Sequence, residues 1–154
     1  VLTAKLELNE SRETFEALAT QVHSNKDIGA SIASGSFRTS GMVVIPCSMN
    51  TLSGIANGAS SNLITRAADV TLKERRKLVL VTREAPLNLI HLRNMTLATE
   101  AGAIIMPPVP SFYLGPCSLD DAVTQMAGRV LDQFNIDVPD MRRWEGTVQE
   151  SGKL

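Results

Sequence analysis

The chain has 154 residues, 15 basic and 16 acidic side chains, a formal net charge of -1 and 44% hydrophobic residues. This length and apolar fraction predict one globular domain with a substantial core. The balanced charge excludes a broad basic face that would attract nucleic acid or an anionic membrane. No apolar run reaches the roughly 18 residues of a membrane span. Cys47 and Cys117 are too few for a disulfide framework, and both lie beside proline in apolar sequence, which favours a reducing compartment.

The first forty residues carry weak patterns. Helical spacing predicts a helix over 10–20 and a shorter one over 27–33, and the small, hydroxylated run 34–41 predicts a loop. The first buried strand is expected over 42–46, where an apolar run ends in a proline.

A strand-to-helix turn is predicted at 47–51. Ser48 is a good N-cap, and the apolar residues after it recur at helical spacing as far as Asn57. Such a turn presents free backbone N–H groups at the positive end of a helix dipole, which suits a phosphate or the polar edge of a ring. Plain capping is the alternative, but capping needs only Ser48 and leaves the hydroxyl of Thr51 without a role.

A second helix is expected over 62–74. Arg66 and Lys73 are seven residues apart, so they lie on nearly one stripe of this helix. Asp69 is at a spacing that allows an ion pair with either of them. A solvated charged face is the simplest interpretation of this stripe.

The strongest strand signal is the run 78–81, Leu-Val-Leu-Val. Uninterrupted apolar residues are typical of a strand that is buried on both faces. Arg83 and Glu84 follow, and Pro86 then ends the ladder. Ligands bind at the carboxyl edge of open parallel sheets, so we expect Arg83 to bind an anion and Glu84 to transfer a proton. A surface ion pair between these two residues is the alternative.

A helix over 87–101 and a buried strand over 103–106 follow. His91 on this helix has no second His or Cys at ligand spacing, so it is interpreted as structural or exposed, and no metal site is expected. Three buried strands that alternate with helices predict right-handed βαβ units in a layered α/β sheet. A fourth strand is expected in residues 1–8 or upstream of Val1.

The last part of the chain begins with the proline-rich segment 109–116, which predicts a stiff loop whose Tyr113 hydroxyl can reach the strand ends. Ser118, with an acid three residues on, predicts a capping box. Arg129 lies at the edge of the helix that Ser118 opens. The expected apolar face of this helix consists of Val123, Met126, Ala127, Val130, Leu131 and Phe134.

Several runs of this sequence resemble the flavin prenyltransferases of the UbiX type, a family formerly described as aromatic acid decarboxylases. The resemblance covers roughly residues 22–146, in order and at nearly constant spacing. The matching runs are SGSF at 34–37, PCSMNTL at 46–52, LITRAADV at 63–70, LKERR at 72–76, REAPL at 83–87, MPPVPSFY at 106–113 and RVLDQF at 129–134.

The resemblance implies a three-layer, flavodoxin-like or Rossmann-like α/β fold with a parallel sheet, as one domain over 1–146 with a tail at 147–154. It implies an enzyme that joins a dimethylallyl group from dimethylallyl phosphate to reduced FMN, making prenylated FMN for a separate UbiD-type decarboxylase. A cytoplasmic homo-oligomer, a dodecamer with sites between subunits, is expected, with a mitochondrial location left open. A related cysteine-decarboxylase-type flavoprotein and a non-catalytic flavin-binding or assembly subunit stay open as alternatives.

The family pattern also implies roles for individual residues. Glu84 is the acid/base near the reacting ring. The flavin is lined by Ser48, Met49, Asn50 and Thr51, and is contacted, with the phosphate, by Arg83. The allylic phosphate is held by Lys73, Tyr113 and Arg129, with Arg66 near the same site. Cations and a phenol that receive the charge of a leaving phosphate lower the barrier without a metal. Whether the donor is a mono- or a diphosphate stays open.

The resemblance has one departure. Family members open with a strand and a glycine-rich loop, G-A-S/T-G, that cradles the flavin, and this loop does not occur in the chain. Val1-Leu2-Thr3 matches the end of the family's second strand only weakly, with Thr3 in place of a serine.

Overall fold

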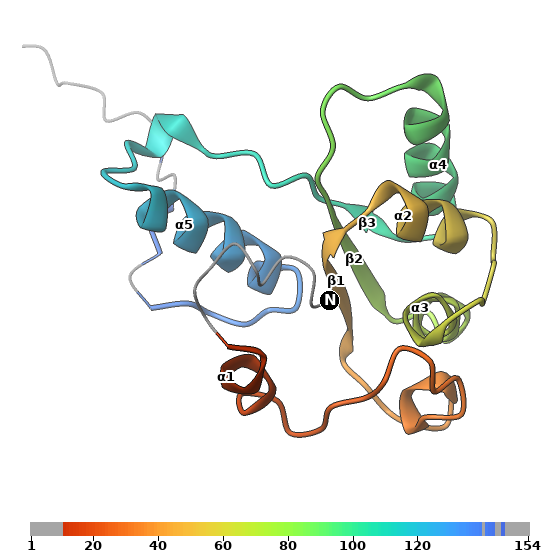
Figure 1. Cartoon of the computed structure of the whole chain (residues 1–154). Coiled ribbons are helices and arrows are strands. Elements are labelled where there is room, and N and C mark those ends of the chain that lie inside the picture. Colours follow the sequence, from red (N-terminus) through yellow and green to blue (C-terminus); the bar gives the residue numbers. More distant parts are fainter. Residues whose placement is uncertain (1–10, 140, 144–145, 147–154) are drawn as a thin grey trace, which may run out of the picture. The chain divides into compact units, whose positions relative to one another are not determined.

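The computed structural model describes residues 11–139, 141–143 and 146, and Figure 1 shows how the helices and strands follow one another. The chain divides into two compact units, Val1–Pro108 and Val109–Leu154, and each is described by itself. The prediction of a single domain over 1–146 stays a prediction.

The first unit is built on a parallel sheet in the order β1-β2-β3. Its strands are β1 (Gly41–Cys47), β2 (Lys77–Thr82) and β3 (Ile104–Ile105). Val44 pairs with Leu80, and Leu80 pairs with Ile105. The β1–β2 register is irregular between Val44 and Cys47, where Pro46 has no N–H for the ladder. The predicted parallel α/β sheet is confirmed, and the strand expected in residues 1–8 lies outside the described residues.

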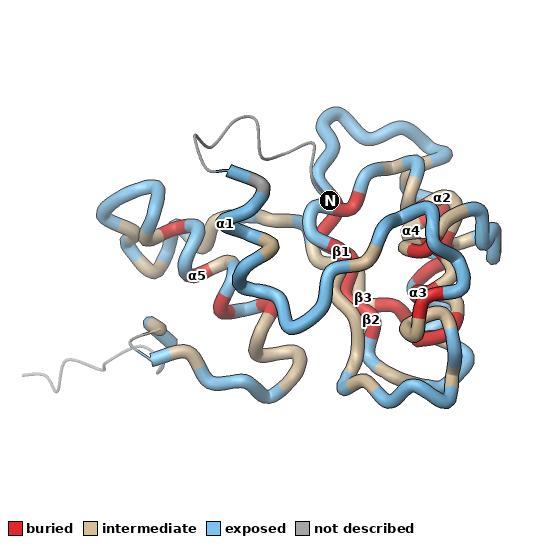
Figure 2. The backbone as a smooth tube through the Cα atoms, turned by 60° about the horizontal axis from the view of Figure 1, so that its bottom comes forward, coloured by how far each residue is buried: buried red, intermediate tan, exposed pale blue. Residues whose placement is uncertain are grey.

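The core lies between this sheet and three helices, α2 (Met49–Ala56), α3 (Leu63–Lys73) and α4 (Leu89–Glu100). These helices cover one face of the sheet (Figure 1). β2 is buried on both faces as predicted, because Leu78, Val79 and Leu80 have no exposed surface. Figure 2 shows the buried backbone of this unit concentrated in the strands and in the inner sides of the helices.

Helices α2 and α3 approach closely at Gly54. A Cβ at this position would lie 3.1 Å from Cγ2 of Thr65, so the glycine permits the approach. Thr65 also completes the capping box of α3: its N–H donates to Asn62 Oδ1 at 3.0 Å, and the N–H of Asn62 donates to Thr65 Oγ1 at 3.3 Å. One threonine therefore contributes to the start of α3 and to its packing.

The structure differs from the predicted elements before β1. Helix α1 spans only Arg12–Glu16, where a helix over 10–20 was expected. The segment 27–33 forms turns and a 3-10 helix, η2 (Ser31–Ala33), in place of the expected helix. The carboxylate of Asp27 accepts from the N–H of Gly29 at 3.1 Å, a local turn that competes with helix formation.

Helix α4 begins two residues later than predicted because Asn88 caps it. The N–H of His91 donates to Asn88 Oδ1 at 2.9 Å, and the N–H of Asn88 donates to His91 Nδ1 at 3.4 Å. This capping box confirms a structural position for His91. The cysteines differ from each other: Cys47 is buried as its sequence context suggests, whereas Cys117 is exposed.

The second unit contains the 3-10 helix η3 (Phe112–Leu114) and helix α5 (Leu119–Asp132). Ser118 caps α5 by accepting from the N–H of Asp121 at 3.0 Å. Asp121 in turn accepts from the N–H of Cys117 at 3.0 Å, so the reciprocal bond goes to the residue before the predicted cap.

The predicted apolar face of α5 is wrong in part. The buried residues are Ala122, Gln125, Gly128 and Val130, whereas Val123 is half exposed. The physical reason is the returning segment after α5. The Gln125 amide pairs with the backbone of Arg142, accepting from its N–H at 3.0 Å and donating to its C=O at 3.2 Å. Gly128 leaves room for the side chain of Met141.

Candidate flavin and phosphate site

A pocket of about 560 Å³ opens at the carboxyl ends of β1 and β2, the edge at which the sequence predicts a ligand site. It is a mixed pocket, with aliphatic side chains, a thiol, two hydroxyls, amides and one charge of each sign. The lining residues are Asn25, residues 42–51, Asn62, Ile64, Arg83 and Glu84. The structure thus brings together all the residues predicted to line the flavin, and Glu84 with them.

The N-terminus of α2 supplies hydrogen-bond donors to this pocket. Ser48 Oγ accepts from the N–H of Thr51 at 3.2 Å and lies 3.0 Å from its hydroxyl, and the C=O of Ser48 accepts from Leu52. Within the described residues, no group accepts from the N–H of Met49 or Asn50. These N–H groups remain at the positive end of the α2 dipole, where they suit a polar ring edge or an anion.

The N-terminus of α3 is capped by Asn62 and Asn25, two pocket residues that no sequence pattern indicated. The C=O of Asn25 accepts from Leu63 at 2.9 Å, and its Oδ1 accepts from the N–H of Ile64 at 3.1 Å. Together with the Asn62 cap, these bonds occupy the first donors of α3. Asn25 lies 37 positions before Asn62, so no local sequence pattern connects the two.

Arg83 and Glu84 stand exposed at the rim of the pocket. The surface ion pair between them, the alternative interpretation, is not found among the described residues. Glu84 Oε1 instead accepts from the N–H of Ala85 at 3.2 Å. Both charged groups are therefore available to a ligand at the edge of the sheet.

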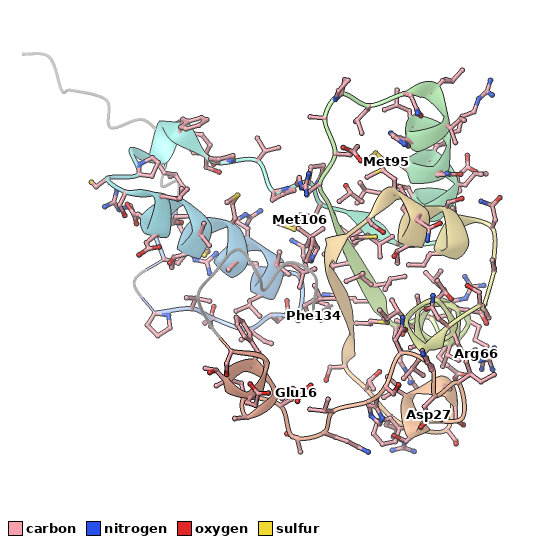
Figure 3. All side chains as sticks on the ribbon, in the orientation of Figure 1. Glu16, Asp27, Arg66, Met95, Met106 and Phe134 are labelled. Atoms are coloured by element: carbon pink, nitrogen blue, oxygen red, sulfur yellow. The ribbon has the colours of Figure 1, made fainter. Side chains whose placement is uncertain are left out.

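The charged stripe on α3 is only partly as expected. Arg66, labelled in Figure 3, pairs with Asp69 at 2.9 Å. Lys73 pairs with its neighbour Glu74 and not with Asp69, and this hydrogen bond lowers the pKa of Glu74. Arg66 lies one turn beyond the pocket-lining end of α3 and does not itself line the pocket.

Lys73 lies away from this edge. It ends α3 shortly before β2 begins at Lys77, and its ammonium group packs where a Cβ on Gly35 would stand. Both β1 and β2 begin at this end of the sheet, since their first residues, Gly41 and Lys77, pair with each other. Within one chain, Lys73 is therefore at the opposite end of β2 from Arg83 and Glu84.

Tyr113 and Arg129 belong to the second unit. Tyr113 is exposed in η3, and Arg129 in the last turn of α5 pairs with Asp132 at 2.7 Å. Asp132 also accepts from Arg143 at 2.9 Å. The Arg143 hydrogen bond, with that of Arg129, outweighs burial and holds the pKa of Asp132 below its usual range. The predicted phosphate-binding roles of Tyr113 and Arg129 stay predictions.

Neither a metal site nor a membrane-spanning helix is found in the part of the chain that the structure describes. That part contains no group of three or more His, Cys, Asp or Glu residues placed to hold a metal ion. None of its helices combines the length and apolarity needed to cross a bilayer.

Comparison with known proteins gives concordant matches. Residues 4–130 match the family model described as "Flavoprotein". The chain is 57% identical over 146 residues to flavin prenyltransferase UbiX of Escherichia coli K12, covering 94% of this chain and 77% of that protein. It is 56% identical over 147 residues to flavin prenyltransferase UbiX of Thauera aromatica, covering 96% and 76%.

Two solved structures match closely. One is a dodecameric FMN-dependent UbiX-like decarboxylase from Escherichia coli O157:H7, with a TM-score of 0.90 and 52% identity, covering 94% of this chain and 78% of that one. The other is AnUbiX (PadA1) in complex with FMN and dimethylallyl pyrophosphate, with a TM-score of 0.91 and 52% identity, covering 94% and 77%.

Proposed function

Because the chain belongs to the flavoprotein family and, within it, to the flavin prenyltransferases of the UbiX type, we propose that it joins a dimethylallyl group to reduced FMN. The product is prenylated FMN. The observation that carries the proposal is the pocket at the carboxyl edge, which combines the open N-terminus of α2 with Arg83 and Glu84 at its rim.

The pocket residues fit a flavin. A volume of about 560 Å³ lies in the range of sites that enclose a small organic ligand, roughly 300–1,000 Å³. Aliphatic side chains such as Val44 suit the faces of a ring, and the N–H groups of Met49 and Asn50 suit its polar edge. Ser48 and Thr51 add hydroxyls that donate or accept.

The chain's own groups account for the rest of the chemistry. When bound, reduced FMN supplies the nucleophilic ring that accepts the dimethylallyl group. Arg83 attracts the donor's phosphate and stabilises the charge that builds on it as the carbon–oxygen bond breaks. Glu84 at the rim is placed to move a proton at the reacting ring. Arg66, Lys73, Tyr113 and Arg129 are proposed to hold the phosphate.

The position of Lys73 supports a site that is completed between copies of the chain. Lys73 and Arg83 bind one phosphate only if they come from different subunits, as in a homo-oligomer with shared sites. The dodecamer solved for the relative from Escherichia coli O157:H7 supports such an assembly. We also propose that a UbiD-type decarboxylase receives the product. The cytoplasmic location stays a prediction.

Incubation of the protein with reduced FMN and dimethylallyl phosphate under anaerobic conditions tests the proposal. Mass spectrometry of the released flavin is expected to show the mass of one added five-carbon prenyl unit. Parallel reactions with oxidised FMN and with the diphosphate donor serve as a control and as a test of donor choice. A protein that binds FMN but forms no prenylated product with either donor would contradict the proposal and favour the non-catalytic alternative.

A further inference from the structure

Arg76 lies between the end of α3 and the start of β2, and its side chain contacts a segment much earlier in the chain. Nη1 donates to the C=O of Phe37 at 2.8 Å, and Nη2 donates to the C=O of Gly35 at 2.7 Å. We name residues 34–37, which contain these carbonyls, the clamped loop. Figure 1 shows η2, which leads into this loop, beside α3. Two bonds from one planar guanidinium determine where the loop lies relative to the end of α3.

The clamped loop meets the side chain of Lys73 at Gly35. A Cβ at position 35 would lie 2.6 Å from Nζ of Lys73, so the ammonium group occupies space that only a glycine leaves open. Glu74 pairs with this ammonium group, and its carboxylate also lies against Gly35. Oγ of Ser34 and Oγ of Ser36 lie 2.9 Å apart, which closes the loop across the glycine. The place of the Lys73 ammonium group therefore depends on the place of the loop.

The charges of this cluster suit a lysine that binds an anion. The hydrogen bond and charge of Lys73, with a smaller contribution from the charge of Arg76, lower the pKa of Glu74. The carboxylate therefore stays ionised and keeps its partner. Because two cations accompany this one carboxylate, the cluster has a net positive charge and still attracts a phosphate. The pair with Glu74 thus orients Lys73 without cancelling the charge of the cluster.

We propose that Arg76 is a positioning residue for Lys73: it holds the clamped loop in the place where Gly35 receives the Lys73 ammonium group. The inference rests on the proposed function and deepens it, because Lys73 is one of the cations proposed to hold the donor's phosphate. Both terminal nitrogens of Arg76 are bonded to the loop, so Arg76 acts through Lys73 and not on the phosphate itself.

Lys73 needs such a restraint because it is the last residue of α3 and its side chain is 48% exposed. A free lysine side chain samples many rotamers, and restricting it when the anion arrives costs binding free energy. A loop that has already restricted the ammonium group removes part of this cost. Arg76 is therefore expected to affect the donor step and to leave flavin binding unchanged.

A structural tether is the alternative role for Arg76. Bonds to two carbonyls stabilise a loop whether or not a lysine lies beside it. The two roles differ in what they require. A tether acts through the fold and is independent of Lys73, whereas a positioning effect disappears when Lys73 is removed.

Lysine reactivity tests the contact without flavin or donor. The intact protein is treated with a trace of acetic anhydride, and peptide mass spectrometry gives the acetylation rate of Lys73 relative to that of the exposed Lys26. Arg76→Gln is expected to raise this ratio about threefold or more, because the released ammonium group loses a contact comparable to an exposed ion pair. A folded Arg76→Gln variant with the parent ratio overturns the proposal.

Arg75→Gln is the matched control for loss of charge. Arg75 is exposed, adjoins Arg76 and makes no side-chain hydrogen bond or ion pair within the described part of the chain. The variant removes a neighbouring cation and leaves the clamped loop bonded, so the acetylation ratio of Lys73 is expected to equal that of the parent. An equal rise in both variants would assign the effect to charge alone and overturn the proposal.

Gly35→Ala moves the lysine and leaves the bonds of Arg76 in place. The added methyl group meets Nζ of Lys73 and the carboxylate of Glu74, which are the ends of flexible side chains, so the backbone of the loop does not have to shift. The acetylation ratio is expected to rise as in Arg76→Gln. Gly29→Ala is the control, because its Cβ would have only an ordinary contact, at 3.5 Å. A parent ratio in Gly35→Ala overturns the proposal even where Arg76→Gln does not fold.

A double-mutant cycle with Lys73→Ala separates positioning from a tether. Arg76→Gln is expected to lower kcat/KM for dimethylallyl phosphate about tenfold, the effect of one hydrogen bond to a charged group, with FMN affinity unchanged. In the Lys73→Ala background, Arg76→Gln is expected to lower the residual kcat/KM no further. Equal losses in both backgrounds, or weaker FMN binding, show a tether and overturn the proposal. A parent protein that forms no prenylated FMN contradicts the proposed function instead, and the acetylation rates still test Arg76.

Discussion

Lys73 and Arg83 stand at opposite ends of β2, although the family pattern assigns both to one phosphate. Lys73 is the last residue of α3, just before the strand, and Arg83 follows Thr82, the last residue of the strand. At about 3.3 Å per residue, the six-residue strand separates them by roughly 20 Å. Two extended side chains do not bridge this distance around one anion. A complete phosphate site therefore requires a second chain.

Mixed assemblies of inactive variants test this conclusion. Lys73→Ala and Arg83→Ala are each expected to lose most of the prenyl transfer, because each removes a cation that stabilises the leaving phosphate. When the two variants are co-expressed, up to about a quarter of the parent activity should return, since random assembly joins an intact Lys73 to an intact Arg83 in that share of shared sites. The amount of prenylated FMN formed per subunit, compared with that of the parent protein, measures the recovered activity.

The matched control combines Arg83→Ala with Glu84→Gln. These residues stand side by side at one end of one strand, so no mixed site contains both wild-type groups from a single chain. No recovery is expected for this pair. Recovery with both pairs, or with neither, would contradict a site shared between the two ends of β2.

Glu84→Gln is expected to lower the rate of prenylated-flavin formation by about 10²- to 10⁴-fold, the usual contribution of a proton-transfer group. The amide keeps the size of the side chain, and Glu84 accepts only a local bond from Ala85 at 3.2 Å, so folding should be unchanged. FMN affinity, measured by fluorescence titration, is expected to stay near that of the parent. Glu100→Gln on α4 provides a control for loss of an exposed carboxylate, and a Glu84→Gln variant as fast as this control would exclude proton transfer by Glu84.

Ser48→Ala separates capping from flavin binding. Ser48 caps α2 through the N–H of Thr51 at 3.2 Å, and Ser118 caps α5 through the N–H of Asp121 at 3.0 Å. Removing either hydroxyl is expected to lower the free energy of unfolding by about 1 kcal/mol, measured by urea titration. Only Ser48 lines the pocket, so only Ser48→Ala should also weaken FMN binding. Equal FMN affinities in the two variants would show that Ser48 caps α2 and does not contribute to flavin binding.

The sheet was predictable from sequence because its signals are local. The run 78–81 is apolar at every position, and this pattern required burial on both faces, which β2 has. The turn at Ser48 was predictable for the same reason, since a cap and its helix are adjacent in sequence. Residues placed by such local patterns were also the ones that the structure brought into one pocket.

The rest required contacts between distant residues. The inner side of α5 is set by Met141 and Arg142, which follow the helix, so apolar periodicity predicted this side only in part: Val130 is buried, whereas Val123 is half exposed. The C=O of Asn25 accepts a hydrogen bond from the N–H of Leu63, 38 positions later in the chain. Helical propensity, which is local, does not predict that bond. Lys73 was assigned to the phosphate site by the family resemblance alone, and the length of β2 separates it from Arg83 within one chain.

Cys47 provides a final test of the pocket's chemistry. Burial raises the pKa of its thiol to about 11 from a usual 9.0, so the thiol is protonated and a poor nucleophile near neutral pH. In iodoacetamide at pH 8, peptide mass spectrometry is expected to show the exposed Cys117 labelled at least about tenfold faster than Cys47.

The raised pKa of Cys47 also determines how the stability of the fold changes with pH. The unfolded thiol loses its proton near pH 9 while the folded thiol keeps its own until about pH 11, so this contribution to stability is complete below pH 9 and is lost as the pH rises toward 11. Cys47→Ala should therefore flatten the fall in the free energy of unfolding across that range, whereas Cys117→Ala should not. Equal labelling of both cysteines would show that Cys47 is solvated and that the pocket is more open than the structure describes.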